Sequence, residues 1–131
     1  MTDVSAHVGH ERDVEVEAWE GVVTWRTLLS GDRTPTSGLT IGSAEIEPGA
    51  SERGARHHHA DPEAYYFISG TGLVHIDGIE HPVEPGSIVF IPGDTPHFVR
   101  NTGTETIKLL FVFAVDSYDD VHYVYDDETP Q

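Results

Sequence analysis

Three potential metal ligands lie within seven residues of one another, in the run His-His-His-Ala-Asp-Pro-Glu that spans residues 57–63. Side chains two positions apart in a strand project from the same face, so His57 and His59 would point in one direction and His58 in the other. A tight Ala-Asp-Pro corner would then let Glu63 join the two histidines. The spacing therefore predicts that His57, His59 and Glu63 converge.

A second stretch, residues 86–101, contributes His97 after a turn rich in Pro and Gly. Together, the patterns H-x-H-x3-E-x6-G and G-x5-P-x4-H-x3-N resemble the paired motifs of the cupin superfamily. That resemblance implies a small β-barrel in which His57, His59, Glu63 and His97 bind one metal ion. Ser51 and Asp94 stand where the family usually has Gly, and both are turn positions that tolerate small or Asx residues.

Such a donor set suits one divalent transition metal. Imidazole nitrogens and a carboxylate bind iron, manganese, nickel, zinc or cobalt, and the chain has no cysteine that could supply a thiolate. Four protein ligands leave one or two positions open on a five- or six-coordinate ion, which is typical of a catalytic site. The alternative is a solvated histidine turn beside a surface glutamate, but histidines rarely fall at two matching spacings by chance.

The strand that follows Glu63 carries a candidate general base. Alternation along this strand directs Tyr65 and Phe67 into the barrel and Tyr66 outward. A free phenol has a pKa near ~10, but a divalent cation at close range favours the phenolate and makes it a usable base near neutral pH. The alternative for Tyr65 is a packed tyrosine whose hydroxyl bonds to the backbone.

A narrower resemblance covers most of the chain, from about Trp25 to Tyr125. The H-x-H-x3-E-x-Y run, the segment Arg-Asn-Thr-Gly at 100–103 and the tail from 113 through 123 are similar to small single-cupin dimethylsulfoniopropionate lyases. In those enzymes a metal holds the substrate carboxylate, a tyrosine removes the α proton, and dimethyl sulfide leaves to give acrylate. The resemblance implies that Tyr65 is the base and that Tyr123 is a second catalytic tyrosine. Trp25, Phe67 or Phe98 could accept the sulfonium cation.

Other functions stay open at this point. The first-motif region also resembles polyketide cyclases of the same superfamily, and cupins include dioxygenases and non-catalytic binders. The leading interpretation is a metal-dependent lyase. The alternatives are a cupin dioxygenase, a cyclase-like enzyme, and a metal- or ligand-binding module without catalysis.

Composition restricts the partners. The 23 acidic and 7 basic residues give a formal net charge of -16, which would repel nucleic acid and anionic lipid. No apolar run reaches the roughly 18 residues of a membrane span, and the first residues lack a signal pattern. We therefore expect a small-molecule substrate and a cytoplasmic location.

Short apolar or alternating runs separated by Gly and Pro turns indicate about ten strands and no long helix. Asp77-Gly78 between two isoleucines predicts a hairpin. The pattern predicts an all-β fold, and with the resemblance a single-domain double-stranded β-helix, the cupin jelly-roll barrel. We expect a flexible arm over 1–12, the domain over 13–125 and a disordered acidic tail over 126–131. The alternation from Asp13 to Glu17 predicts an edge strand that needs a partner, which favours a homodimer.

Overall fold

The computed structural model describes residues 4–19, 23–50 and 57–125, and for Trp19, His57, His58 and Tyr125 it describes only the backbone. Strands form almost all of the regular structure in these residues, with two short 3-10 helices. The elements are η1 (Glu11–Asp13), β1 (Glu17–Trp19), β2 (Val23–Leu29), β3 (Thr40–Ile46), β4 (His57–His58), β5 (Glu63–Ser69), β6 (Gly72–Ile76), β7 (Ile79–Val83), β8 (Ile88–Ile91), β9 (His97–Arg100), β10 (Ile107–Phe113), η3 (Tyr118–Asp120) and β11 (Val124–Tyr125).

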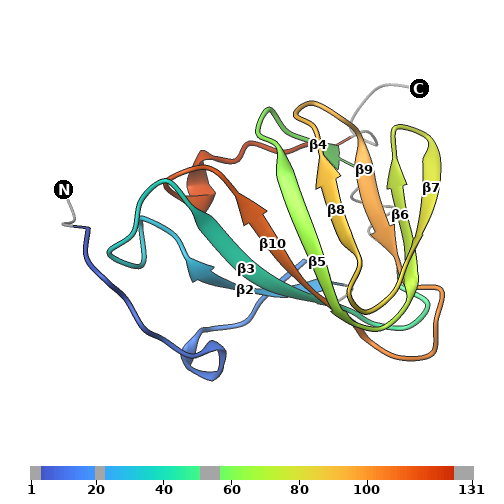
Figure 1. Ribbon diagram of the computed structural model, residues 1–131, viewed down its shortest axis with the longest axis horizontal. Helices are drawn as coiled ribbons and strands as arrows, with labels where there is room; N and C mark the ends of the chain where they lie inside the picture. Colours follow the sequence, from blue (N-terminus) through green and yellow to red (C-terminus); the bar gives the residue numbers. More distant parts are fainter. Residues whose placement is uncertain (1–3, 20–22, 51–56, 126–131) are drawn as a thin grey trace.

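Two antiparallel sheets form the walls of a jelly-roll barrel (Figure 1). Sheet A has the strand order β1-β2-β3-β10-β5-β8, and sheet B has the order β11-β4-β9-β6-β7. In sheet A the last long strand, β10, lies between β3 and β5 and pairs with both. The predicted all-β jelly-roll fold is confirmed.

Side chains from every second position of the strands fill the barrel. In β10, every second residue from Ile107 to Phe113 is buried, and in β5 the inward positions are Glu63, Tyr65 and Phe67. Close packing also explains one glycine in β3. A Cβ on Gly42 would lie 2.1 Å from Cζ of Phe111, so only glycine leaves room for that ring at this position.

The turns occur at residues that favour turn conformations. Asp77 and Gly78 connect β6 to β7 as predicted, with φ values of 49° and 85°, which is the left-handed pair that a two-residue hairpin turn requires. Asp94, in the turn before β9, has a φ of 58°. An aspartate adopts this conformation more readily than most residues, so it can stand where a glycine is usual.

The predicted edge strand over 13–17 is wrong. Asp13 ends η1, and β1 begins only at Glu17. Before Glu17, side chains from distant strands and not a strand ladder hold the chain: Lys108 Nζ lies 2.7 Å from a carboxylate oxygen of Glu11. Arg26 Nε also donates to the carbonyl of Val14 at 3.2 Å. The segment therefore crosses the outside of sheet A instead of extending it.

Two further expectations concern the ends of the chain. The predicted tail over 126–131 lies outside the described residues, and the boundaries of the arm and the domain stay predictions. Within the described ranges, the structure contains no helix of the length and apolarity needed to cross a membrane.

Candidate metal centre

The rings of His59 and His97 are oriented by backbone carbonyls. His59 follows β4, and its Nδ1 lies 2.7 Å from the carbonyl oxygen of Asp61 in the corner that leads to β5. His97 begins β9, and its Nδ1 lies 2.8 Å from the carbonyl oxygen of Thr95. A carbonyl can only accept, so each Nδ1 is the donor. In a neutral ring this tautomer leaves the lone pair on Nε2.

Both Nε2 atoms face the same carboxylate. Oε1 of Glu63 lies 3.2 Å from Nε2 of His59 and 3.2 Å from Nε2 of His97. The three side chains are almost fully buried. Burial acts to raise the pKa of Glu63, but the hydrogen bonds and charges of the two histidines outweigh it and hold that pKa below its ordinary value.

This arrangement fits a metal ion. The three ligand atoms lie within 4.8 Å of one another. If both rings were neutral, their Nε2 lone pairs would point at a carboxylate and repel it. The arrangement therefore requires positive charge among the three groups, supplied either by protons on the rings or by one metal ion. Two imidazole nitrogens and a carboxylate are suitable donors for a divalent first-row metal, and carbonyl bonds to the second ring nitrogen are the usual support of such ligands.

The fourth predicted ligand, His57, is placed only through its backbone. In β4 it lies opposite His97 of β9 on one side and Tyr125 of β11 on the other. Its side chain lies outside what the structure describes. The structure therefore brings together His59, Glu63 and His97, and the role of His57 stays a prediction.

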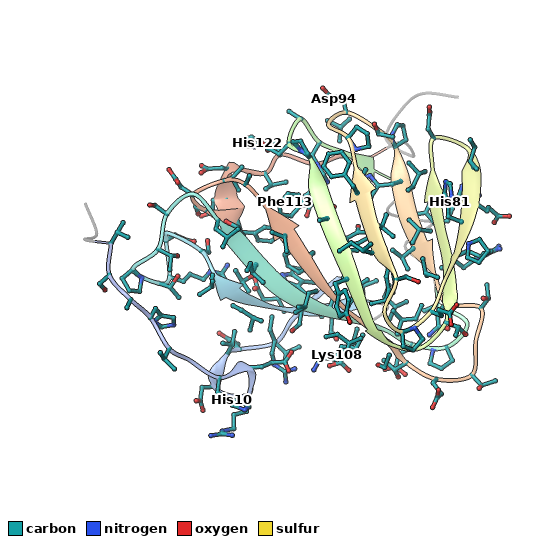
Figure 2. The ribbon with its side chains drawn as sticks, in the orientation of Figure 1. His10, His81, Asp94, Lys108, Phe113 and His122 are labelled. Carbon is teal, nitrogen blue, oxygen red and sulfur yellow. The ribbon has the colours of Figure 1, made fainter. Side chains whose placement is uncertain are left out.

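The turn that contains Asp94 is joined to the centre. The backbone N–H of Asp94 donates to the carbonyl of His59 at 2.6 Å, so the turns of the two motifs hold each other. Figure 2 shows Asp94 and His122 at one end of the barrel and Lys108 at the other. His122 is exposed.

Tyr65 lies in the barrel, as its position two residues after Glu63 predicts. It is 5% exposed, whereas Tyr66 on the opposite face is 44% exposed. The ring centroid of Tyr65 lies 6.4 Å from that of His97 and 6.1 Å from that of Phe67. Tyr65 therefore lies near the candidate ligands, on the strand that supplies the carboxylate, and its role as the base stays a prediction.

The second predicted tyrosine, Tyr123, contacts the candidate ligand His59 directly. Its ring meets the ring of His59 edge-on at 5.3 Å, and its hydroxyl lies 2.9 Å from the hydroxyl of Tyr118. Burial, together with the nearby charges of Tyr118 and Glu63, raises the pKa of Tyr123 well above its ordinary value. The hydroxyl is therefore protonated near neutral pH and can donate a hydrogen bond.

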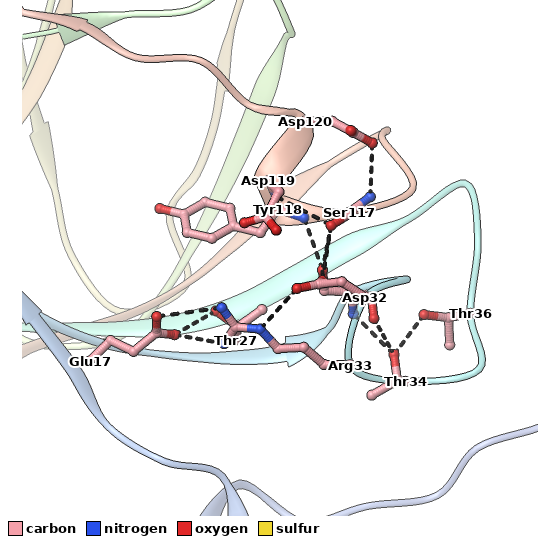
Figure 3. Close-up of polar contacts among 11 residues, drawn as sticks. Glu17, Thr27, Asp32, Arg33, Thr34, Thr36, Ser117, Tyr118, Asp119 and Asp120 are labelled. Carbon is pink, nitrogen blue, oxygen red and sulfur yellow. Dashed lines mark hydrogen bonds and ion pairs between the residues drawn. The ribbon is translucent and has the colours of Figure 1, made fainter. Parts of the chain in front are cut away.

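Tyr118 is a residue that sequence reasoning missed. The segment that carries it is fastened to the loop after β2 (Figure 3). The backbone N–H of Tyr118 donates to Oγ of Ser30 at 2.9 Å, and the hydroxyl of the neighbouring Ser117 donates to Asp32 at 2.9 Å. Ser30 also donates to Asp32, and this bond is the main reason that the pKa of Asp32 lies below its ordinary value. The only signal in the sequence is the spacing of tyrosines at 118, 123 and 125.

The three aromatic candidates for binding a cation have different locations. Phe67 is fully buried in the core beside Tyr65, and Trp25 packs against the same core. Among the described residues, the indole N–H of Trp25 is buried without a hydrogen-bond partner. Phe98 lies on the face of β9 opposite to His97, and its ring centroid lies 4.5 Å from that of His75. It is therefore outside the barrel interior.

Comparison with known sequences identifies relatives over most of the chain. A family model described as "Cupin domain" matches residues 42–113. Dimethylsulfoniopropionate lyase DddW of Ruegeria pomeroyi is 36% identical over 103 residues, which make up 79% of this chain and 66% of that lyase. The match thus spans slightly less than two thirds of the lyase. An oxalate-binding protein of Thermotoga maritima is 27% identical over 111 residues, covering 85% of this chain and 91% of that protein.

Comparison with solved structures agrees on the architecture. The polyketide cyclase RemF from Streptomyces resistomycificus superposes with a TM-score of 0.76 at 20% sequence identity, and the match covers 93% of this chain and 86% of that one. At this identity the similarity concerns the fold.

Proposed function

The chain belongs to the cupin family, and from this premise we propose that it is a metal-dependent enzyme that removes the α proton of a small carboxylate and expels a β substituent. The proposed substrate is dimethylsulfoniopropionate or a close analogue. The observation that carries the proposal is the position of Tyr65, buried on the same strand and the same face as Glu63 of the His59–Glu63–His97 cluster.

The residues that would hold the metal are His59, Glu63 and His97, with His57 as the fourth. A divalent ion bound by them supplies positive charge that attracts a substrate carboxylate and stabilises the negative charge that develops when the α proton leaves. The carbonyls of Asp61 and Thr95 fix the ring orientations, so the donor atoms are in place before any ion binds.

The two tyrosines have different proposed tasks. The oxygen of Tyr65, as phenolate, accepts the α proton, and the electrons of that C–H bond form the new Cα–Cβ double bond. The Cβ–S bond breaks and its electrons leave with dimethyl sulfide, so the products are acrylate and a neutral sulfide. Tyr123 keeps its proton and donates a hydrogen bond to the bound substrate, and the bond to Tyr118 at 2.9 Å restricts the direction of that donation.

The test is release of dimethyl sulfide into the headspace from purified protein of known metal content, with dimethylsulfoniopropionate as substrate. Release should fall by at least 100-fold in Tyr65→Phe, which keeps the ring and the ligands but removes the proton acceptor. Tyr66→Phe is the matched control, because its ring lies on the outer face of the same strand. Metal-loaded protein that releases no dimethyl sulfide would reject the proposal.

The oxalate-binding relative supports a second candidate, a module that holds a small carboxylate on the metal without converting it. This candidate predicts saturable binding of oxalate by calorimetry, dependent on metal, with no product and no effect of Tyr65→Phe. Turnover of any carboxylate that depends on Tyr65 would exclude it.

A further inference from the structure

The chain is fastened to the barrel as soon as it leaves β10. The hydroxyl of Thr40, a fully buried residue of β3, donates to the carbonyl of Val115 at 2.9 Å. The backbone N–H of Gly31, in the loop after β2, donates to the carbonyl of Asp116 at 2.6 Å. This approach is tight, because a Cβ on Gly31 would lie 2.7 Å from that carbonyl oxygen. The position of the backbone just before Tyr118 is therefore fixed.

Three polar side chains fix the next turn of the chain (Figure 3). Ser30 is fully buried and donates its hydroxyl proton to Asp32. A hydroxyl has one proton, so the lone pairs of Ser30 remain for the backbone N–H of Tyr118, 2.9 Å away. Ser117 donates to the same carboxylate at 2.9 Å, and its oxygen accepts from the N–H of Asp119 in η3. We call Ser30, Asp32 and Ser117 the polar clasp.

Tyr118 extends from the polar clasp to the candidate metal centre. The centroid of its ring lies 5.8 Å from that of Phe111 and 6.3 Å from that of Phe113, which are two buried residues of β10. Its hydroxyl oxygen lies 2.9 Å from that of Tyr123, whose ring contacts His59. With its backbone held by the polar clasp and its ring packed on β10, Tyr118 places its hydroxyl at a defined position beside Tyr123.

The bond between the two tyrosine hydroxyls can run in two directions. Each hydroxyl has one proton and accepts through its lone pairs. A substrate carboxylate can only accept, so when it is bound by Tyr123, as proposed above, it takes the one proton of that hydroxyl. Tyr118 must then be the donor in the bond between the tyrosines. Hydrogen bonds in such a chain polarise one another, so donation from Tyr118 makes Tyr123 the stronger donor.

We propose that Tyr118 is a positioning residue, whose hydroxyl donates to the oxygen of Tyr123 and so holds the Tyr123 proton toward a carboxylate at the metal centre. The polar clasp keeps Tyr118 in the place that this requires. The inference rests on the proposed donation by Tyr123, and it applies to a bound carboxylate whether or not that carboxylate is converted. Negative charge grows on a substrate carboxylate as its α proton leaves, so the loss of this bond lowers kcat more than it raises KM.

The experiment is a double-mutant cycle of Tyr118→Phe and Tyr123→Phe in full-length protein loaded with one Ni²⁺ per chain. The first readout is release of dimethyl sulfide, and the second is calorimetric binding of acrylate, a small carboxylate that needs no conversion. Tyr118→Phe keeps the ring but removes the hydroxyl, and should lower kcat by about 10-fold and weaken acrylate binding by about 3-fold. In the Tyr123→Phe background the same substitution should change neither quantity, because the hydroxyl that Tyr118 positions is absent.

Tyr66→Phe is the control for loss of a tyrosine hydroxyl. Tyr66 is 44% exposed on the outer face of β5, so this variant should keep the kcat and the acrylate affinity of the wild type. Ser117→Ala opens the polar clasp and should lower kcat by about 3-fold, again only where Tyr123 is present. Thermal unfolding verifies that the variants fold, and Ser117→Ala takes the place of Tyr118→Phe in the cycle if the latter does not.

Equal losses in both backgrounds would assign Tyr118 a structural role only and overturn the inference. Unchanged acrylate affinity in Tyr118→Phe, or a wild type that does not bind acrylate, would overturn it as well. A wild type that binds acrylate but releases no dimethyl sulfide would reject the proposed lyase activity, and the binding cycle would then decide the role of Tyr118 by itself.

Discussion

Replacement of Glu63 by Gln tests the metal centre without reference to any substrate. The substitution keeps the size and one oxygen of the side chain but removes the only formal negative charge among the three described candidate ligands. The donor atoms lie within 4.8 Å of one another, so an ion among them is closer than that to Oε1. A divalent cation and a unit negative charge about 4 Å apart attract by about 8 kcal/mol at an effective dielectric constant near 20.

Part of this attraction is offset in the wild type, because burying a carboxylate costs more free energy than burying an amide. We therefore expect Glu63→Gln to weaken metal binding by on the order of 10²- to 10³-fold, or about 3 to 4 kcal/mol. The same loss should appear in thermal unfolding, because a ligand that binds only the folded state stabilises it according to its affinity.

The assay is calorimetric titration of untagged, metal-free protein with Ni²⁺ at pH 7.5, with thermal unfolding at several Ni²⁺ concentrations as the second readout. Glu84→Gln, at an exposed position after β7, is the control and should bind as the wild type does. If Glu63→Gln took up one Ni²⁺ per chain with unchanged affinity, the carboxylate would not be a ligand. The cluster would then be an ion pair between Glu63 and protonated histidines.

Three further predictions concern the fold and the fourth ligand. Gly42→Ala places a methyl group 2.1 Å from the ring of Phe111 and should lower the midpoint of thermal unfolding by on the order of 10 °C. Gly49→Ala, whose Cβ would meet no atom within 4 Å, should lower that midpoint less. The pKa of Asp32 is depressed from 3.8, so its stabilisation is complete above that pH and is lost as the pH falls through the folded value. Urea unfolding should separate Asp32→Asn from the wild type at pH 7, and the difference should shrink as the pH falls below 3.8. His57→Ala should weaken Ni²⁺ binding by at least about 10-fold with circular dichroism unchanged, and equal affinity would remove His57 from the ligand set.

Alternation predicted those parts of the site that depend on a single strand. Because the side chains of a strand point to opposite faces in turn, the position of Glu63 was sufficient to predict that Tyr65 is buried and Tyr66 exposed. The hairpin at Asp77-Gly78 was equally local, since the turn type depends on two residues. The contact between His97 and Glu63 could be predicted only from the resemblance to a family, because no local rule places residues 34 positions apart in contact.

The errors and omissions arose from contacts between distant segments. The run of alternating residues over 13–17 has the pattern of a strand, yet Lys108 and Arg26 hold the segment across the sheet by their side chains. Tyr118 reaches Tyr123 only because Ser30 and its loop fasten the segment around it. Such contacts depend on the completed barrel, and no periodicity in the sequence records them.

The position of β10 has a consequence for how the protein is made. Sheet A consists of β1-β2-β3 on one side and β5-β8 on the other, and β10 is the strand that joins them. A ribosome delivers β10 after all of these strands, so during synthesis the two parts of the sheet have no strand ladder between them. The pairing of β10 with β3 connects residues more than sixty positions apart, a type of contact that forms slowly. The barrel that surrounds Glu63 should therefore close only near the end of translation, and nascent chains that stop before residue 107 should bind no metal tightly.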